Sequence, residues 1–376
     1  MIEVKNKRQG ALEKFGLYYL NRFSVSRSDH KPFDISDAEL NRKVRKISQK
    51  GILLSALTGI ILVFPIVWLD VKYFDAPIYI HYGIVLAATI LTTIIEFYIL
   101  FLISLKAVHE VSEIINMHAR ERDYLDGIFG VKNILARTAL EIPDPELEIL
   151  GIDPFKRMSK KNLLILGLLY KAKIIISNIV LKLILVFTVG PAFMGIPIAY
   201  EALLVEAFWN GMVLKRVVNE ARLRLFGFAL AEEIAANVVQ EGLIFKLSHT
   251  AQIGCIRSIG NAVVMTQNYH PNMIILLVHF QDILKIKEVH QYDNWAEFLH
   301  TLSRVETRER NFLLDLFTVA AAFDGKLSGL EKDHLQEVFK EDHDLYYPRL
   351  QQLTDSLKEG RLNQALTLCR LDFTAG

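Results

Sequence analysis

Residues 162–214 read NLLILGLLYKAKIIISNIVLKLILVFTVGPAFMGIPIAYEALLVEAFWNGMVL. Apolar side chains predominate in this stretch, and Gly190-Pro191 divides it into two arms, residues 163–189 and 191–214. Each arm is longer than the roughly 20 predominantly apolar residues that a helix needs to cross a bilayer. A proline inside a helix breaks or kinks it. We therefore predict two transmembrane helices that reverse direction at Gly190-Pro191.

A single span over residues 183–200 is the alternative, because that run contains no charged side chain. It contains Gly190-Pro191 and Pro197, however, which do not suit one straight helix. Both flanks of the stretch are basic, and positive residues gather on the cytoplasmic side of a membrane. A segment that is basic at both ends enters and leaves on the same side, which favours the hairpin. The basic residues are Lys160, Lys161, Lys171 and Lys173 on one flank, and Lys215, Arg216, Arg222 and Arg224 on the other.

A first hairpin precedes this one. Residues 51–69 carry no charge, and residues 84–105 carry only Glu96. Both runs are long enough to cross ~30 Å of hydrocarbon, and a composition of 52% hydrophobic residues agrees with membrane spans. The sequence thus predicts an all-α polytopic membrane protein with four transmembrane helices in two hairpins. The distribution of positive residues predicts that both termini lie in the cytoplasm. We expect the membrane to be a cell (inner) membrane.

The predicted spans divide the chain into six segments. They are residues 1–50, N-terminal cytoplasmic or interfacial helices; 51–105, the first transmembrane hairpin; 106–161, a cytoplasmic helical extension; 162–214, the second transmembrane hairpin; 215–304, a cytoplasmic helical region; and 305–376, a C-terminal helical module. Residues 1–23 mix apolar and basic side chains, so they either lie on lipid headgroups or pack on another part of the protein. Residues 106–126 repeat apolar side chains at spacings of three and four, which predicts a helix that packs against another helix.

Charged residues inside the predicted spans require an explanation, since each costs about 2.5–3.5 kcal/mol at the bilayer centre on insertion scales. At ~1.5 Å per residue, Lys182 and Glu201 lie about 12 Å and about 15 Å from the predicted turn. Lys173 and Glu206 lie about 26 Å and about 22 Å from it. Opposite charges therefore match in depth twice across the hairpin.

Glu96 lies near the middle of its span, and we expect it to join Lys182 and Glu201. One interpretation of this cluster is a polar pathway for an ion or proton around the axis of an oligomer. The other is that the charged pairs only fix the register of the helices. No internal repeat is visible in the sequence, whereas dedicated transporters are often built from repeated halves.

A short motif lies in the C-terminal segment: Ala320-Ala321-Ala322-Phe323-Asp324-Gly325-Lys326-Leu327-Ser328, followed by Glu331. Ser328 and Glu331 form a capping box, which predicts a new helix after the Asp-Gly turn. Lys326 occupies the third position of a would-be calcium loop, where an oxygen ligand is required, and this argues against an EF-hand.

Residues 305–370 resemble the TerB-like modules, helical domains associated with tellurite resistance. The matching turn residues are Asp324, Gly325, Ser328 and Glu331. The resemblance implies an all-helical cytoplasmic module of a type linked to membrane-associated stress and defence systems. Such modules have been associated with metal binding through acidic residues. Only Asp324 and Glu331 match here, so we expect no metal site.

The sequence lacks the common signatures of catalysis. It has no Gly-x-Ser-x-Gly and no His-Glu-x-x-His, and Cys255 and Cys369 lie far apart. Lys and Arg total 43 against 42 Asp and Glu, so no global positive field points to nucleic acid. We expect a protein that is not an enzyme and that carries no cofactor.

Two hypotheses for the function lead. The first is a membrane-anchored scaffold or sensor that forms a homo-oligomer in the lipid bilayer and binds a cytoplasmic protein through residues 305–376. The alternative is an oligomeric ion channel or transporter that uses Glu96, Lys182 and Glu201. A membrane-bound hydrolase ranks last, because no nucleophile or metal constellation is visible.

Overall fold

A computed structural model gives the fold and describes residues 10–23, 32–116, 130–141, 152, 196–266, 270–286, 291–327 and 329–371. Within these ranges the chain forms helices joined by turns, without a strand, so the prediction of an all-α fold is confirmed. The helices are α1 (Ala11–Leu20), α2 (Asp37–Lys72), α3 (Ile78–Ile114), α4 (Val131–Ala139), α6 (Ile196–Gln240), α7 (His249–Thr266), α8 (Pro271–Leu284), α9 (Trp295–Arg304), α10 (Thr307–Ala322), α11 (Gly329–Phe339), α12 (His343–Glu359) and α13 (Leu362–Leu368), with the short 3-10 helices η1 (Pro32–Asp34), η4 (Ile244–Lys246) and η5 (Lys340–Asp342).

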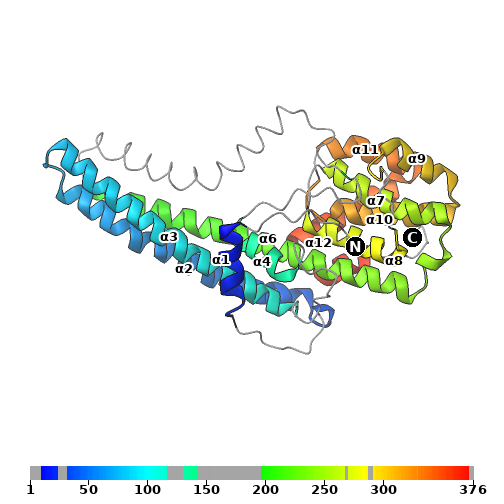
Figure 1. The fold of residues 1–376 in the computed structure, drawn as a ribbon, viewed down its shortest axis with the longest axis horizontal. Coiled ribbons are helices and arrows are strands. Elements are labelled where there is room, and N and C mark those ends of the chain that lie inside the picture. Colours follow the sequence, from blue (N-terminus) through cyan, green and yellow to red (C-terminus); the bar gives the residue numbers. More distant parts are fainter. Residues whose placement is uncertain are drawn as a thin grey trace.

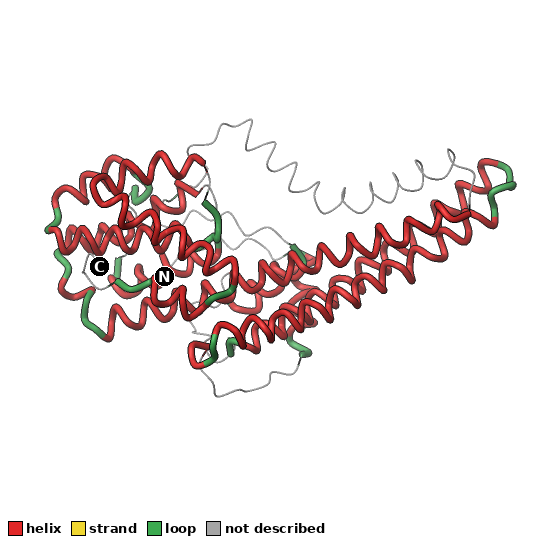
Figure 2. Tube along the Cα trace, turned by 180° about the vertical axis from the view of Figure 1, so that it is seen from behind, coloured by secondary structure: helices red, strands yellow, loops and turns green. Residues whose placement is uncertain are grey.

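The molecule has a long arm and a body (Figure 1). In the arm, α2, α3 and the first half of α6 lie side by side. In the body, α7 to α13 assemble with the second half of α6. Figure 2 shows the same division from behind. Helix α6 therefore belongs to both parts and connects them without a break.

Helices α2 and α3 are the two in the described part of the chain that are long and apolar enough to cross a membrane. Large apolar side chains along both are exposed, among them Leu53, Ile61, Leu91 and Ile94, each with 61–65% of its surface accessible. A soluble monomer rarely exposes an apolar surface of this extent. The arm is therefore suited to contact with lipid, as the first predicted hairpin requires.

The second predicted hairpin lies mostly outside the described residues. Its first helix and its turn at Gly190-Pro191 belong to the range 153–195, and α6 begins at Ile196. From there α6 continues through the predicted second helix of this hairpin and packs along α2 and α3. The structure thus describes helices at three of the four predicted spans, of which α2 and α3 are long and apolar enough to cross a membrane.

Small residues on α2 allow α6 to approach closely. Gly51, Ser55 and Gly59 recur at every fourth position, so they lie on one face of α2, and all three are buried. A Cβ atom added at Gly51 would lie 2.3 Å from the Cδ2 of Leu214, and one at Gly59 would lie 2.7 Å from the Nδ2 of Asn210. Helices in lipid use small residues in this way, because close van der Waals packing is a main force that holds them together there.

The N-terminal helix α1 packs on α3 and α4. A Cβ added at Gly16 would lie 2.8 Å from the Cβ of Ala136, so the two helices touch directly. The buried Glu13 pairs with Arg137 at 2.6 Å. Of the two interpretations of residues 1–23, the structure supports the one in which the helix packs on the protein.

Helix α3 continues beyond the second apolar run, but only to Ile114. The predicted helix over 106–126 was too long, because Asn116 has a left-handed backbone conformation with φ +50°, which ends the helix. Residues 117–129 lie outside the described residues. Val108 and Val111, on the predicted apolar face, are fully buried. That face therefore packs inside the protein as expected.

Aromatic rings form the centre of the body. Phe298 of α9 stacks on Phe317 of α10 with 5.4 Å between ring centroids. Phe339 of α11 stacks on Tyr346 of α12 at 5.2 Å and meets the edge of Phe317 at 6.1 Å. Residues 271–280 of α8 are all buried, and α8, with 14 residues, is a core helix that is too short to span a bilayer.

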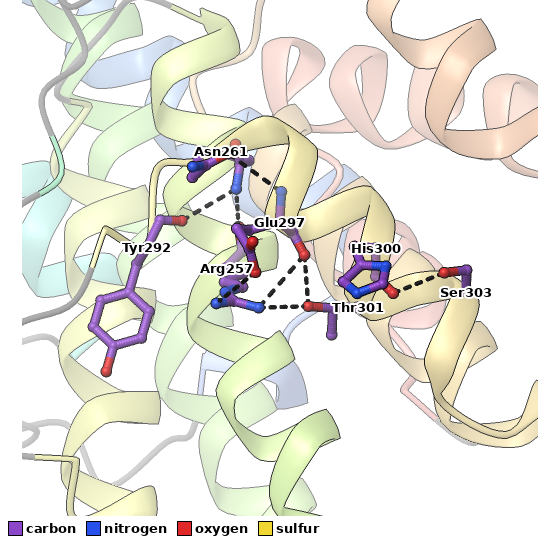
Figure 3. Close-up of polar contacts among 8 residues, drawn as sticks. Arg257, Asn261, Tyr292, Glu297, His300, Thr301 and Ser303 are labelled. Carbon is purple, nitrogen blue, oxygen red and sulfur yellow. Dashed lines mark hydrogen bonds and ion pairs between the residues drawn. The ribbon is translucent and has the colours of Figure 1, made fainter.

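Polar contacts join α7 to α9 and to the segment that precedes α9 (Figure 3). The Nη1 of Arg257 donates to the Oγ1 of Thr301 at 2.7 Å, and its Nη2 lies 3.3 Å from the Oε2 of Glu297. The Nδ2 of Asn261 donates to the carbonyl oxygens of Arg257 at 2.9 Å and Tyr292 at 3.1 Å. These side chains are thereby engaged in holding the elements of the body together.

Helix α13 closes onto the start of α2. The Asp37 carboxylate accepts the backbone N–H groups of Asn363 at 2.8 Å and Gln364 at 3.2 Å. The side chain of Asn363 donates to the carbonyl oxygen of Ile35 at 2.7 Å. The first residue of α2 thus caps the first turn of α13.

We predict that Asp37→Ala loosens α13, because two N–H groups in its first turn lose their acceptor. The free energy of opening should fall by about 1–2 kcal/mol, measured by hydrogen exchange of the amides of residues 363–368. Glu39→Ala is the matched control, since its carboxylate pairs on the surface with Lys43 at 3.0 Å, a contact that contributes about 0.3–0.5 kcal/mol. Equal exchange in the two variants would contradict the role of Asp37.

Candidate functional site

A layer of buried polar groups crosses the apolar arm. Glu96 of α3 is 1% exposed, and its Oε1 accepts a hydrogen bond of 2.6 Å from the Nδ2 of Asn210 on α6. Buried polar groups need hydrogen-bond partners, and this bond supplies one to the carboxyl group of Glu96. The contact joins the two helices in the middle of the predicted second span.

Glu206 lies one turn before Asn210 on the same face of α6 and is also 1% exposed. Both residues reach the α2 face at Gly59, where an added Cβ would lie 3.1 Å from the Cγ of Glu206 and 2.7 Å from the Nδ2 of Asn210. The layer thus contains two carboxyl groups and one amide, contributed by α3 and α6. It faces Gly59 of α2, which has no side chain.

Two of the five residues of the predicted cluster, Glu96 and Glu206, lie in this layer. Lys182 and Lys173 lie outside the described residues, and Glu201 is in α6 with a side chain that is likewise not described. The matching of opposite charges across the hairpin stays a prediction. The structure brings Glu96 into contact with Asn210, a neutral side chain that the predicted cluster of charged residues did not include. The available signal was the spacing of Glu206 and Asn210 by one helical turn.

The chemistry of this layer suits two roles. A carboxyl group inside a membrane exchanges protons or attracts cations wherever water reaches it, which is the basis of proton and ion pathways. The hydrogen bond from Asn210 to Glu96 also holds α3 and α6 in one register. Both interpretations therefore apply to Glu96, now with Asn210 and Glu206 as its neighbours.

The second candidate site is the turn that resembles TerB-like modules. α10 ends at Ala322, and Asp324 and Gly325 form the predicted turn. Gly325 has φ +66°, a conformation that side chains disfavour, and the Oδ1 of the buried Asp324 accepts the N–H of Lys326 at 2.9 Å. Ser328 lies outside the described residues, and Glu331 is in α11 with a side chain that is not described. The predicted capping box is therefore untested.

Asn272 connects this turn to α6. It is fully buried at the start of α8, and its Nδ2 donates to the carbonyl oxygens of Leu223 on α6 at 3.1 Å and Phe323 in the turn at 3.0 Å. Gly227 leaves the space that the amide occupies. Gly325 also lies against α6, since an added Cβ would be 3.1 Å from Leu223. The turn is thereby fixed to the helix that continues from the arm.

Within the described residues, no group of three or more His, Cys, Asp or Glu side chains is arranged to hold a metal ion. Asp324 is engaged with the backbone of its own turn. Asp324 and Gly325 therefore have a structural role in this turn.

Comparisons with protein-family models, curated proteins and solved structures gave no match to this chain. The resemblance to TerB-like modules therefore stays a prediction.

We predict that Gly227→Ala destabilises the junction of α6, α8 and the turn. The new Cβ would lie 2.0 Å from the Nδ2 of Asn272, which must move and lose both hydrogen bonds. The free energy of unfolding should fall by about 2–4 kcal/mol, measured by thermal unfolding in detergent. Gly83→Ala in α3 is the control, because nothing lies within 4 Å of its new Cβ. If Gly227→Ala were as stable as Gly83→Ala, the tight contact with Asn272 would be refuted.

Proposed function

We propose that this chain is a membrane-anchored helical scaffold or sensor whose C-terminal module, residues 305–376, binds a protein partner. The observation that carries the proposal is the continuity of α6, which runs from the arm to the body in one helix. The Leu223 to Gly227 segment of α6 holds the turn at Asp324 through Asn272. A shift of α6 in the membrane would therefore reach the module directly.

We propose the full topology of four spans in an inner membrane, with both termini in the cytoplasm. The packing of the three helices of the arm supports this topology. Gly51 of α2, Ala107 of α3 and Leu214 of α6 lie together, since a Cβ at Gly51 would contact both other residues. The residues beside them, Lys50, Lys106 and Lys215, are all basic. Three helices thus change from apolar to basic at one level, as expected at a cytoplasmic membrane surface.

We propose that the module is of the TerB-like type and that the protein acts with partners in stress or defence. Support comes from the observed helix, turn and helix of α10 and α11 around Asp324 and Gly325. The exposed apolar surface of α2 and α3 also suits contacts between copies of the chain in the membrane, which supports a homo-oligomer.

The test uses surface substitutions, because deletion of residues 306–376 would remove α10, which is mostly buried in the core of the body. Leu345 on α12 is 41% exposed within the module, and Phe245 on η4 is 71% exposed outside it. We expect Leu345→Arg to reduce recovery of the partner from detergent extracts at least tenfold, whereas Phe245→Arg preserves it. Membrane insertion and subunit number should stay unchanged in both variants. Recovery of the same proteins by both variants and the wild type would exclude this role for the module.

An oligomeric channel or transporter is the second candidate, favoured by the burial of Glu96 and Glu206 in the arm beside Asn210. If the layer conducts, Glu96→Gln should abolish proton or cation flux into liposomes, whereas Glu113→Gln, beyond the apolar run of the same helix, should not. Absence of flux from the wild-type protein would exclude conduction. In that case Asn210→Leu should still lower the free energy of unfolding by about 1.5–3 kcal/mol, because Glu96 loses a hydrogen bond.

A further inference from the structure

A cavity of about 450 Å³ lies where the arm meets the body. Three elements surround it: α6, the turn at residues 324–326, and the end of α12. The turn that Asn272 fixes to α6 thus forms part of the wall of this cavity. The charged residues of its lining are Lys215, Arg216, Glu220, Arg222, Asp324, Lys326 and Lys358.

The two carboxylates of the lining are already engaged. Glu220 lies 2.7 Å from the Nε of Arg224 and 3.7 Å from the Nε2 of His270. Burial alone would raise the pKa of Glu220, but the contact with His270 and the charge of Arg224 outweigh it and hold that pKa well below its ordinary value. Asp324 accepts the N–H of Lys326. Glu220 is thereby paired within the protein, whereas a neutral N–H does not cancel the charge of a carboxylate, so Asp324 offsets part of the positive charge of the lining.

The positively charged residues of the lining have few partners of opposite charge. Arg216 pairs with Glu141, but among the described residues no carboxylate lies within ion-pair distance of Lys215, Lys326 or Lys358. Arg222 donates hydrogen bonds to neutral oxygens, the Oδ1 of Asn41 at 3.4 Å and the carbonyl of Lys358. Burial lowers its pKa, and the negative charge of Glu359 offsets only part of that effect. The buried Nε of Arg222 has no hydrogen-bond acceptor in the described part of the structure. The cavity thus holds an excess of positive charge, since five cationic side chains line it against two carboxylates.

The position of the cavity indicates which class of ligand it would bind. Lys215 directly follows Leu214, the residue that packs on Gly51 at the start of the apolar run of α2. Met212, one turn earlier and 42% exposed, lines the cavity on the arm side. The hollow therefore lies at the boundary between the apolar arm and the basic surface, where the phosphate of a lipid would lie.

We propose that this cavity binds a phosphate group, from the headgroup of an anionic phospholipid or from a soluble phosphate ester. Ammonium groups of lysines attract phosphate as point charges, and the fork of an arginine donates to two of its oxygens. The ligand would contact Lys215 and Arg222 of α6, Lys326 of the turn and Lys358 of α12. It would thereby strengthen the link between arm and module, which deepens and rests on the sensor function proposed above.

Thermal unfolding of the full-length protein in detergent tests the proposal. The probes are dioctanoyl phosphatidylglycerol, dioctanoyl phosphatidylcholine and inorganic phosphate. Phosphatidylglycerol should raise the unfolding temperature of the wild type more than phosphatidylcholine does, and the effect should weaken with salt. Lys326→Gln with Lys358→Gln should weaken the apparent affinity about 25-fold, about fivefold for each charge removed. Both side chains are exposed, so the double variant should fold.

Lys246→Gln with Lys285→Gln is the matched control, because it removes two exposed lysines of the body that do not line the cavity. It should leave the affinity unchanged. Stabilisation by phosphatidylglycerol alone identifies a lipid headgroup, and equal stabilisation by inorganic phosphate identifies a soluble ligand. The proposal is overturned if no probe stabilises the wild type, or if both double variants weaken binding equally. Partner recovery by the same variants is measured separately, so failure of the sensor function is distinguishable from failure of this site.

Discussion

Helix α6 packs so closely on α2 that a Cβ atom added at Gly51 or Gly59 would collide with a side chain of α6, Leu214 or Asn210. This constraint fixes the direction and register of α6 in the arm. Since α6 continues unbroken to Gln240, the same constraint places its second half, on which the body is built. A change in the packing of α2 on α6 therefore alters the position of α8 and of the turn at Asp324 as well.

The two ends of α6 use the same kind of contact. In the arm, Asn210 of α6 faces Gly59 of α2, and in the body Asn272 of α8 faces Gly227 of α6. In both cases an amide fills the space that a glycine leaves and donates to an oxygen from another helix. A neutral amide is much less costly to bury than a charged group and still satisfies directional hydrogen bonds. These contacts give the packing of α6 its specificity.

The periodicity and composition of the sequence were sufficient to predict the fold class and the main helices. The all-helical fold, the long apolar helices around residues 51–69 and 84–105, and the turn at Asp324 and Gly325 were all visible as patterns. The end of α3 was placed wrongly, because apolar spacing continued past Asn116 while the backbone turned left-handed there. The roles of Asn210 and Asn272 could not be predicted, because a single amide leaves no periodic signal in a sequence. Each role depends on the glycine that the amide contacts, which is far away in the sequence. The cavity could not be predicted for the same reason, since its lysines come from three separated elements.

The cap that Asp37 provides to α13 has a consequence for biosynthesis. The carboxylate and the first N–H group that it accepts are 326 residues apart in the chain. In the proposed topology every span has left the ribosome and entered the bilayer before that partner is made. The body therefore reaches its complete fold only when α13 packs against the start of α2. A chain that stops before Asn363 therefore leaves the carboxylate of Asp37 without these two N–H donors, even when its membrane part is intact.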